Sequence, residues 1–293
     1  MHGVLNILKP PGMTSHDVVV QARRILGIKR IGHTGTLDPA AAGVLPLCVG
    51  RATRLVEFLQ EQDKVYRGEI TFGIATDTQD GTGTIIREAE DFDIAWEELI
   101  KASRRLQGAI EQLPPMTSAV RIKGERLYEL ARRGKEIARQ PRLIHIFSWQ
   151  FSPRQQSLTK NSRVMFDIHC SKGTYVRTAV HDIGELLGCG AYLSFLLRTR
   201  SGTFHLDDAI TLEELAKHRE SCLLPMDASL DFPALVLPDK EADQIIHGAI
   251  VPVTTDTGGL VCVYGPRGFV GVGRIEGEGK TKYCRPIKVL ANP

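Results

Sequence analysis

The residues best suited to chemistry lie in one short segment, His33–Pro46, with the sequence HTGTLDPAAAGVLP. Gly35 and Gly43 permit backbone conformations that other residues resist, and Pro39 fixes its own φ and holds Asp38 out of the helical region. The segment therefore predicts a rigid loop that presents a carboxylate. That carboxylate could act as a nucleophile or a general base, although an Asp-Pro pair that simply begins a turn is an equally good interpretation.

The elements before this loop can be predicted from local signals. Val4–Leu8 is a short apolar run that meets a Lys-Pro-Pro-Gly turn, which predicts a strand. Thr14 and Asp17 occupy capping-box positions, so a helix should begin there and end at Gly27. The stretch Ile31–Arg54 is rich in Gly, Thr and Ala and lacks helical periodicity until about residue 50, which predicts a functional loop.

Strand and helix patterns mix along the next part of the chain. Val65–Ile74 and Arg163–Cys170 are the clearest strands, and helices are predicted at Ile94–Leu106, Tyr175–Leu187 and Leu212–His218. No regular alternation of strand and helix is present. The pattern therefore favours an α+β domain built on a largely antiparallel central sheet flanked by helices.

A change of composition near Pro225–Pro238 predicts a linker between a domain at 1–230 and a smaller one at 231–293. The second part begins with a short helix at Asp239–Ile246. Brief Val- and Gly-rich strands follow, separated by turn signals, at roughly 249–253, 260–264, 268–275 and 285–290. This is typical of a small β-barrel.

Charge alone does not identify a nucleic-acid-binding protein, because the formal net charge is only +3. The distribution is more informative. The segment from Arg121 to Arg142 holds eight basic and three acidic residues, which could neutralise phosphates. A solvated helix face would have the same composition, so both interpretations remain open.

Several classes of protein are excluded by composition. The N-terminus lacks the long apolar run of a secretory signal, and no run of 18 apolar residues could span a membrane, so we expect a cytoplasmic protein. The six cysteines are scattered and predict reduced thiols, without zinc spacing. The Gly-Thr-Gly at 81–83 and Gly-Val-Gly at 271–273 lack the context of a nucleotide-binding loop.

Longer motifs carry a resemblance to a known family. The run GHTGTLDPAAAGVLPLCVGRATRL at 32–55 resembles the signature of the TruB family of pseudouridine synthases, which modify uridine 55 in the T loop of tRNA. Further blocks resemble the same family in the same order and extend over most of residues 3–205: LNILKPPGMTSHDVV, PPMTSAV, CSKGTYVRTAVHDIGELLG and LRTRSG.

The resemblance implies roles for individual residues. Asp38 matches the family's catalytic aspartate, Tyr66 its active-site tyrosine, which can stack on the flipped uracil, and Arg177 the arginine that pairs with the carboxylate. His33 and Leu196 match residues near the flipped nucleotide. The reaction has no redox change and no external leaving group, so no cofactor or metal is expected.

The resemblance also implies how tRNA is bound. Lys9 could support the catalytic loop or contact a phosphate, and a region at about 115–145 matches an insertion that closes over the RNA. Its natural phosphate ligands are Arg121, Lys123, Arg126, Arg132 and Arg133. The C-terminal segment resembles a small PUA-like RNA-binding barrel. Departures from the family pattern include Thr117, where an aromatic residue is frequent, and Leu197, where a second arginine often stands.

Two other functions remain to be weighed. An enzyme of the same chemistry could work with a guide RNA inside a ribonucleoprotein, but such relatives usually lack the basic insertion. A non-catalytic RNA-binding or RNA-folding protein could have kept the scaffold. The intact Asp38, Tyr66 and Arg177 set favours a stand-alone enzyme that binds the T stem-loop of tRNA as a monomer, with no obligatory protein partner and no membrane.

Overall fold

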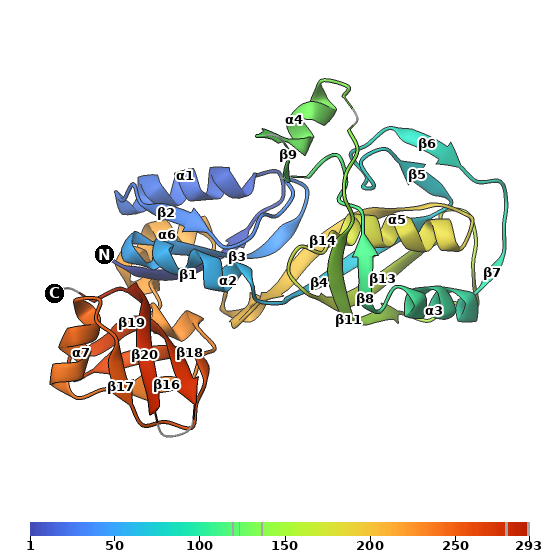
Figure 1. The fold of residues 1–293 in the computed structure, drawn as a ribbon. Helices are drawn as coiled ribbons and strands as arrows, with labels where there is room; N and C mark the ends of the chain where they lie inside the picture. The colour runs from blue at the N-terminus through green and yellow to red at the C-terminus, as the bar shows by residue number, and fades with distance from the viewer. Residues whose placement is uncertain (119, 123, 136, 279–280, 292–293) are drawn as a thin grey trace.

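The computed structural model of the chain describes residues 1–118, 120–122, 124–135, 137–278 and 281–291. Its centre is a nine-stranded sheet in the order β1-β3-β14-β4-β13-β11-β8, with β2 beside β3 and β15 beside β14 (Figure 1). Every pairing between these strands is antiparallel except β3 with β14. The predicted α+β class and largely antiparallel sheet are therefore confirmed. The strands are β1 Gly3–Lys9, β2 Ile31–His33, β3 Ala42–Val49, β4 Lys64–Phe72, β8 Gly108–Gln112, β11 Arg142–Ser152, β13 Arg163–Cys170, β14 Ala191–Ser201 and β15 Phe204–His205.

The first helix has the predicted ends. Helix α1, Ser15–Leu26, begins at Thr14, whose hydroxyl accepts from the Asp17 amide while the Asp17 carboxylate accepts from the Thr14 amide. Gly27 closes it with a φ of 71°, in the left-handed region that glycine adopts without strain. The helix packs its apolar side on β1, β2 and β3.

The predicted loop over Ile31–Arg54 is wrong for most of its length. Ala42–Val49 forms the buried strand β3 between β1 and β14, and Gly50–Leu55 forms a 3-10 helix, η1. The run AGVLPLCV is almost continuously apolar, and such a run is typical of a strand buried on both faces. A true loop remains only at residues 34–41.

The other predicted helices are confirmed within two residues. They are α3 Trp96–Arg105, α5 Val176–Leu186 and α6 Leu212–His218, and α3 and α5 share one apolar core with β4, β11 and β13. The long strands β11 and β14 were not predicted. Strand β14 carries polar residues among its apolar ones, and a strict alternation is interrupted by two register shifts against β4.

A second sheet forms from the C-terminal residues, in the order β16-β18-β19-β20-β17. It comprises β16 Ala234–Val236, β17 Val251–Val253, β18 Gly259–Gly265, β19 Gly268–Glu278 and β20 Thr281–Val289, with helix α7 at Asp239–Ile246 as predicted. The linker prediction is wrong at its end, because β16 pairs with β18. Arg51 Nη1, in η1, donates at 3.1 Å to the carbonyl of Leu290, the residue after β20, and so links the two parts of the chain.

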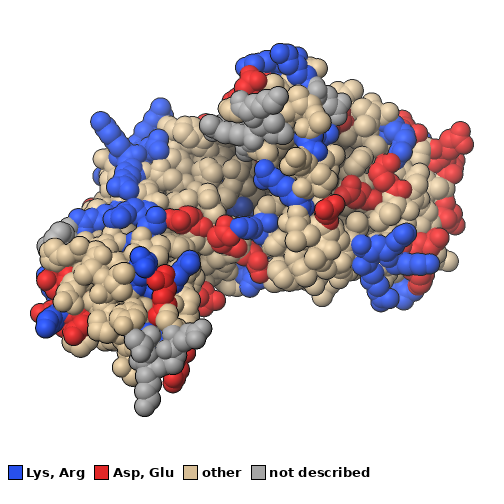
Figure 2. All heavy atoms as spheres, viewed as in Figure 1, with Lys and Arg blue, Asp and Glu red and all other residues tan. Residues whose placement is uncertain are grey.

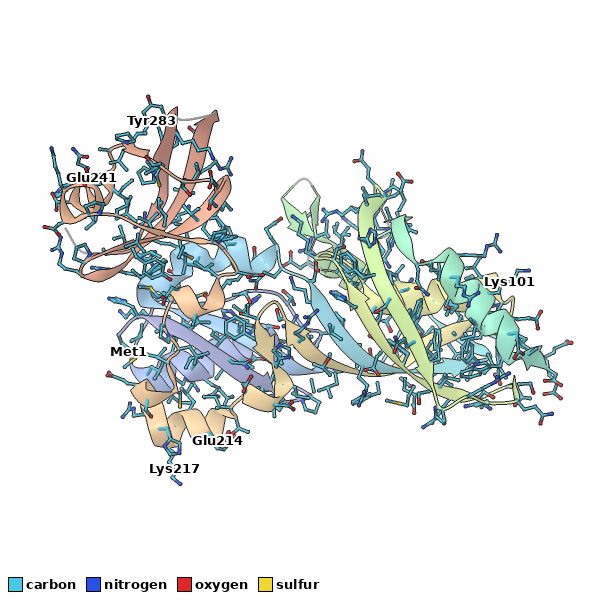
Figure 3. The ribbon with its side chains drawn as sticks, turned by 90° about the horizontal axis from the view of Figure 1, so that it is seen from below. Met1, Lys101, Glu214, Lys217, Glu241 and Tyr283 are labelled. Atoms are coloured by element: carbon cyan, nitrogen blue, oxygen red, sulfur yellow. The ribbon has the colours of Figure 1, made fainter. Side chains whose placement is uncertain are left out.

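The molecule is elongated, with the second sheet and α3 at opposite ends. Figure 3 displays this separation from below, with Tyr283 and Glu241 at one end and Lys101 at the other. No helix in the described ranges is long and apolar enough to cross a membrane. The remaining short elements are α2 Val56–Gln60, β5 Ile74–Thr76, β6 Ile85–Glu88, β7 Ile94–Ala95, β9 Arg121–Ile122, β10 Glu125–Arg126, α4 Leu127–Arg132 and β12 Ser157–Leu158.

Candidate active site

Hydrogen bonds from residues of α1 and β1 hold the loop at 34–41 in place. The Ser15 hydroxyl accepts from the Leu37 amide at 2.8 Å and lies 3.2 Å from the Leu37 carbonyl. The Gly12 amide donates to the Pro39 carbonyl at 2.8 Å, so the Pro-Pro-Gly turn also supports the loop. These bonds fix the backbone on both sides of Asp38.

Lys9 also supports this loop, from a buried position. It is fully buried, and its Nζ donates to the carbonyls of Pro10, Pro39 and Ala41 at 2.9, 3.2 and 2.7 Å. Burial lowers the pKa of Lys9 to about 8, and the nearby Asp38 opposes that shift. All three ammonium protons have carbonyl partners, so Lys9 supports the loop.

A Lys9→Met variant should lose stability. The substitution keeps most of the side chain's volume but leaves three buried or partly buried carbonyls, two of them in the loop, without their donor, at a cost of about 1–3 kcal/mol in the free energy of unfolding. Urea denaturation measures this loss, with Lys29→Met on the exposed surface as the control. Equal stability of the two variants would contradict the supporting role.

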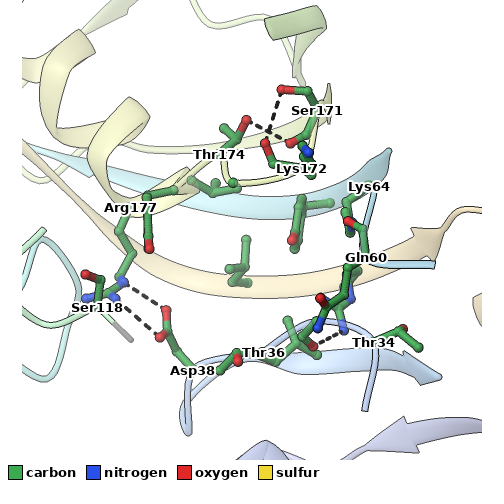
Figure 4. A pocket seen from close by; sticks show the side chains of 18 residues that line it. Thr34, Thr36, Asp38, Gln60, Lys64, Ser118, Ser171, Lys172, Thr174 and Arg177 are labelled. Carbon is green, nitrogen blue, oxygen red and sulfur yellow. Dashed lines mark hydrogen bonds and ion pairs between the residues drawn. The ribbon is translucent and has the colours of Figure 1, made fainter. Parts of the chain in front are cut away.

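Asp38 and Arg177 face each other across the site (Figure 4). Arg177 Nε lies 2.9 Å from Asp38 Oδ2, and Arg177 Nη2 donates to Asp38 Oδ1 at 3.2 Å, which makes a two-point ion pair. The Arg177 side chain is 5% exposed and the Asp38 side chain 37%. The arginine is thus a buried anchor, and the carboxylate keeps an open face.

Arg177 is itself held by groups that sequence reasoning missed. Its Nη1 lies 3.5 Å from Asp80 Oδ2 and donates to the Thr78 carbonyl at 2.9 Å and the Thr117 hydroxyl at 2.6 Å. Asp80 lies in a turn between β5 and β6, far from Arg177 in sequence. Thr117, a departure from the family pattern, is a hydrogen-bond partner here. No local sequence signal links these residues, because only the tertiary fold brings their segments together.

The pKa of Asp38 is raised above its ordinary value. Its enclosed position disfavours the charged form, and this effect is opposed by the Arg177 guanidinium beside it; the nearby Asp80 raises the pKa further. Arg177 therefore favours the ionised form of a carboxyl group whose charged form burial disfavours.

A cavity of about 280 Å³ opens beside Asp38. Tyr66 from β4, Leu196 from β14 and Arg177 from the start of α5 line it together with the loop. A second cavity of about 210 Å³ shares Asp38, Arg177 and Leu196 with the first, and Asp80 also lines it. The Asp38–Arg177 pair thus lines both cavities, whereas Tyr66 lines the first and not the second.

Tyr66 is 8% exposed. Burial raises its pKa, while the charge and a hydrogen bond of Arg198 lower it. The phenol is therefore neutral near pH 7 and can act as a hydrogen-bond donor or as a flat apolar wall. Lys64 and Arg198 also line the cavity, with exposures of 6% and 1%, and neither was predicted.

His33 is placed apart from these residues. It lies on β2, opposite Leu47 of β3, and does not line either cavity. Burial and the charge of Arg198 lower its pKa, so the imidazole is neutral near pH 7. Its Nδ1 is buried with no hydrogen-bond partner among the described atoms.

The basic insertion is described only in part. Lys123 lies outside the described residues, and so do the side chains of Arg121, Arg126 and Arg132, although their backbones form β9, β10 and α4. Arg133 is exposed, and its Nη1 lies 2.9 Å from Glu125 Oε1. Among described residues, no group of three or more His, Cys, Asp or Glu could hold a metal ion.

Three family models match the chain. Residues 23–176 match the TruB family pseudouridylate synthase N-terminal domain, 177–231 the tRNA pseudouridylate synthase B C-terminal domain, and 233–288 the C-terminal domain of pseudouridine synthase II TruB. The chain is 53% identical over 249 residues to tRNA pseudouridine synthase B of Symbiobacterium thermophilum, covering 84% of this chain and 82% of that one. It is 45% identical to the enzyme of the same name from Alkaliphilus oremlandii, covering 99% of each.

Two solved structures contain chains with a similar fold, at lower sequence identity than these relatives. A Cbf5-Nop10-Gar1 complex contains a chain with a TM-score of 0.75 and 27% identity, covering 99% of this chain and 85% of that one. An H/ACA RNP bound to a substrate RNA containing 2'-deoxyuridine contains another, with a TM-score of 0.73 and 25% identity over 99% of this chain and 85% of that one. Since the first family model alone covers more than half of the residues and the relatives match along nearly the whole length, the chain belongs to the TruB family of pseudouridylate synthases.

Proposed function

We propose that this protein converts uridine 55 in the T loop of tRNA to pseudouridine. The observation that carries the proposal is the Asp38 carboxylate, held by Arg177 at the wall of a cavity that Tyr66 and Leu196 also line. The relatives' name, tRNA pseudouridine synthase B, supports tRNA as the substrate.

The isomerisation requires the target nucleotide to leave the RNA stack. Extruding it costs a few kcal/mol because base stacking is lost, and contacts inside the pocket must compensate for this loss. We propose that Tyr66 stacks on the flipped uracil and that Leu196 forms an apolar wall of the pocket. His33 lies outside the pocket lining, and we propose that it positions RNA next to the pocket.

Asp38 then acts on the ribose or the base. The C1′–N1 bond breaks, the uracil turns, a C1′–C5 bond forms, and the proton lost from C5 is balanced by a proton gained at N1. The carboxylate can attack C1′ or assist an elimination, and both routes require it to be ionised. Arg177 favours this charged form and orients both carboxylate oxygens. The chemistry calls for neither a cofactor nor a metal.

We also propose a division of labour along the chain. Residues 1–230 would hold the catalytic site, 115–145 would close over the RNA, and the small sheet of 231–293 would bind RNA as a PUA-like domain. In Figure 2, Lys and Arg side chains gather around α4, above the catalytic half. Among the five proposed phosphate ligands, Arg133, directly after α4, is the one whose side chain the structure describes, and it is exposed.

Replacing the basic residues of the insertion with glutamine should weaken tRNA binding and flatten its salt dependence. Each lost phosphate contact lowers the slope of log Kd against log salt by about 1. Filter binding between 50 and 200 mM salt measures this slope. Arg154→Gln is the control. Arg154 lies outside the insertion, pairs with Glu97, and has a side chain that is 73% exposed. An unchanged slope in the multiple variant would exclude this segment as a clamp.

The guide-dependent alternative is supported by the structural neighbours, whose titles name Cbf5 complexes and an H/ACA RNP. The sequence relatives instead carry a tRNA-modifying name at much higher identity. We therefore propose a stand-alone, monomeric enzyme.

The test is pseudouridine mapping of an unmodified, guide-free tRNA transcript after incubation with the purified chain. We expect modification of uridine 55 alone, and none in a transcript that carries cytidine at that position. Absence of modification by folded protein would favour the guide-dependent enzyme or a non-catalytic RNA binder. Modification at another uridine would overturn the proposed specificity.

A further inference from the structure

Arg198 is a buried charge whose role the proposed chemistry does not explain. It lies on β14 and is 1% exposed, which makes it one of the largest fully buried side chains of the protein. A buried guanidinium is costly unless several acceptors compensate its lost hydration. Its partners therefore indicate what it does.

Those partners lie at both ends of the catalytic loop. Arg198 Nη2 donates to the Gly35 carbonyl at 3.2 Å, and Arg198 Nε donates to the Val44 carbonyl at 2.7 Å. Asp38 lies between these two carbonyls in sequence. One planar guanidinium thus binds the backbone near the start of the loop at 34–41 and in β3 shortly after the loop.

Strands β3 and β14 can approach each other closely because residue 43 is a glycine. This residue pairs with Arg198 across the parallel β3–β14 contact, and its φ is 115°. A Cβ added there would lie 2.2 Å from the Arg198 carbonyl oxygen, so no other residue fits. The backbone of Arg198 is therefore pressed against the end of the catalytic loop.

Arg198 also contacts the other half of the site. It is the cross-strand neighbour of Tyr66 on β4, and its hydrogen bond and positive charge favour the ionised form of that phenol. The same side chain thus donates to the backbone around the Asp38 loop and acts electrostatically on the phenol of its cross-strand neighbour Tyr66.

A β-bulge makes this placement possible. The register of β14 against β4 shifts between Arg198 and Arg200, which pair with Tyr66 and Val65 respectively. Since adjacent residues of β4 face opposite sides of the sheet, the two arginines do so as well. Arg198 points into the site, and Arg200 lies by His169 on the other face, with Arg200 Nη2 3.2 Å from His169 Nε2.

We propose that Arg198 is a positioning residue of the isomerisation, which holds the Asp38 loop and the Tyr66 hydroxyl in one fixed arrangement. The proposal rests on the proposed function, since it assumes that Asp38 and Tyr66 act on the same flipped uridine. It goes further in assigning a specific task to a residue buried behind the site.

The test is a double-mutant cycle on the pseudouridine-forming step. Single-turnover rates, with saturating enzyme in excess over a tRNA transcript, are compared for the wild type, Arg198→Met, Tyr66→Phe and the double variant. Arg198→Met should slow the step by roughly 10²-fold, the scale of a small misplacement of reacting groups. In the Tyr66→Phe variant, the added Arg198→Met substitution should slow the step at least tenfold less. The reason is that the hydroxyl that Arg198 is proposed to position is already absent. Equal losses in both backgrounds would overturn the proposal.

Two further measurements separate positioning from other roles. The tRNA Kd and its salt slope should stay unchanged in Arg198→Met, because a buried guanidinium reaches no phosphate; a flatter slope would identify a phosphate ligand and overturn the proposal. Arg200→Met is the matched control and should keep the wild-type rate. If Arg198→Met fails to fold, Arg198→Lys replaces it in the same cycle, with the same criterion.

Failure of this inference is distinguishable from failure of the proposed function. Wild-type protein that forms no pseudouridine in the transcript contradicts the function itself. Active wild type with equal Arg198→Met losses in both backgrounds contradicts only the positioning role.

Discussion

Replacing Asp38 with asparagine should reduce pseudouridine formation by roughly 10⁴-fold or more, the scale on which loss of an essential catalytic group acts in other enzymes. Asparagine has almost the same shape but cannot carry the negative charge that attack or elimination requires. Arg177 keeps its contacts to Asp80, Thr78 and Thr117, so we expect the variant to fold.

The measurement is single-turnover pseudouridine formation together with the tRNA Kd. Binding should stay within about threefold of wild type, because Asp38 is one small part of an extended RNA interface. A rate close to wild type would exclude Asp38 as the catalytic carboxylate. Undiminished function in cells would support a non-catalytic RNA-folding role instead.

Replacing Arg177 with methionine should have the second largest effect, a loss of roughly 10³-fold in rate with little change in tRNA affinity. The variant removes the two-point contact to Asp38 and leaves Asp38 and Asp80 without the cation between them. Arg67→Met is the matched control. Arg67 also forms a two-point pair with an aspartate, Asp167, at 3.0 Å, but that pair is exposed and lines neither cavity.

Losses of equal size in rate and affinity for Arg177→Met would contradict this assignment and indicate a phosphate ligand. A comparable loss in Arg67→Met would show that the assay reports general damage to the sheet. Arg177→Lys should recover little, because an ammonium group cannot reproduce the planar contact to both oxygens.

The pH dependence of the rate tests the same pair. Because the pKa of Asp38 is raised, its carboxylate is lost at a higher pH than for an ordinary aspartate as the solution is acidified. Activity should therefore fall on the acid side at a pH above the usual aspartate range. Since Arg177 lowers this pKa, the acid limb should move to still higher pH in Arg177→Met. A limb that stays in place would mean that another group controls it.

Local sequence signals determined much of the fold. The capping box of Thr14 and Asp17, the left-handed Gly27 and the apolar period of α5 depend on neighbours within a few residues, and each element appears where it was predicted. The same holds for β13, whose alternating residues match its buried and exposed faces. Strand β3 was missed because an apolar run between glycines is ambiguous until its neighbours β1 and β14 cover it.

The sequence by itself also singled out the Asp38 loop, because glycine and proline at fixed spacing restrict the backbone locally. Only the tertiary structure decided how that loop is held. Lys9, Asp80 and Arg198 come from separate segments, and a charged residue in a sequence looks the same whether it will face water or be buried. Their roles arise from contacts between strands far apart in the chain, and for Arg198 from a bulge that turns one arginine inward and the next outward.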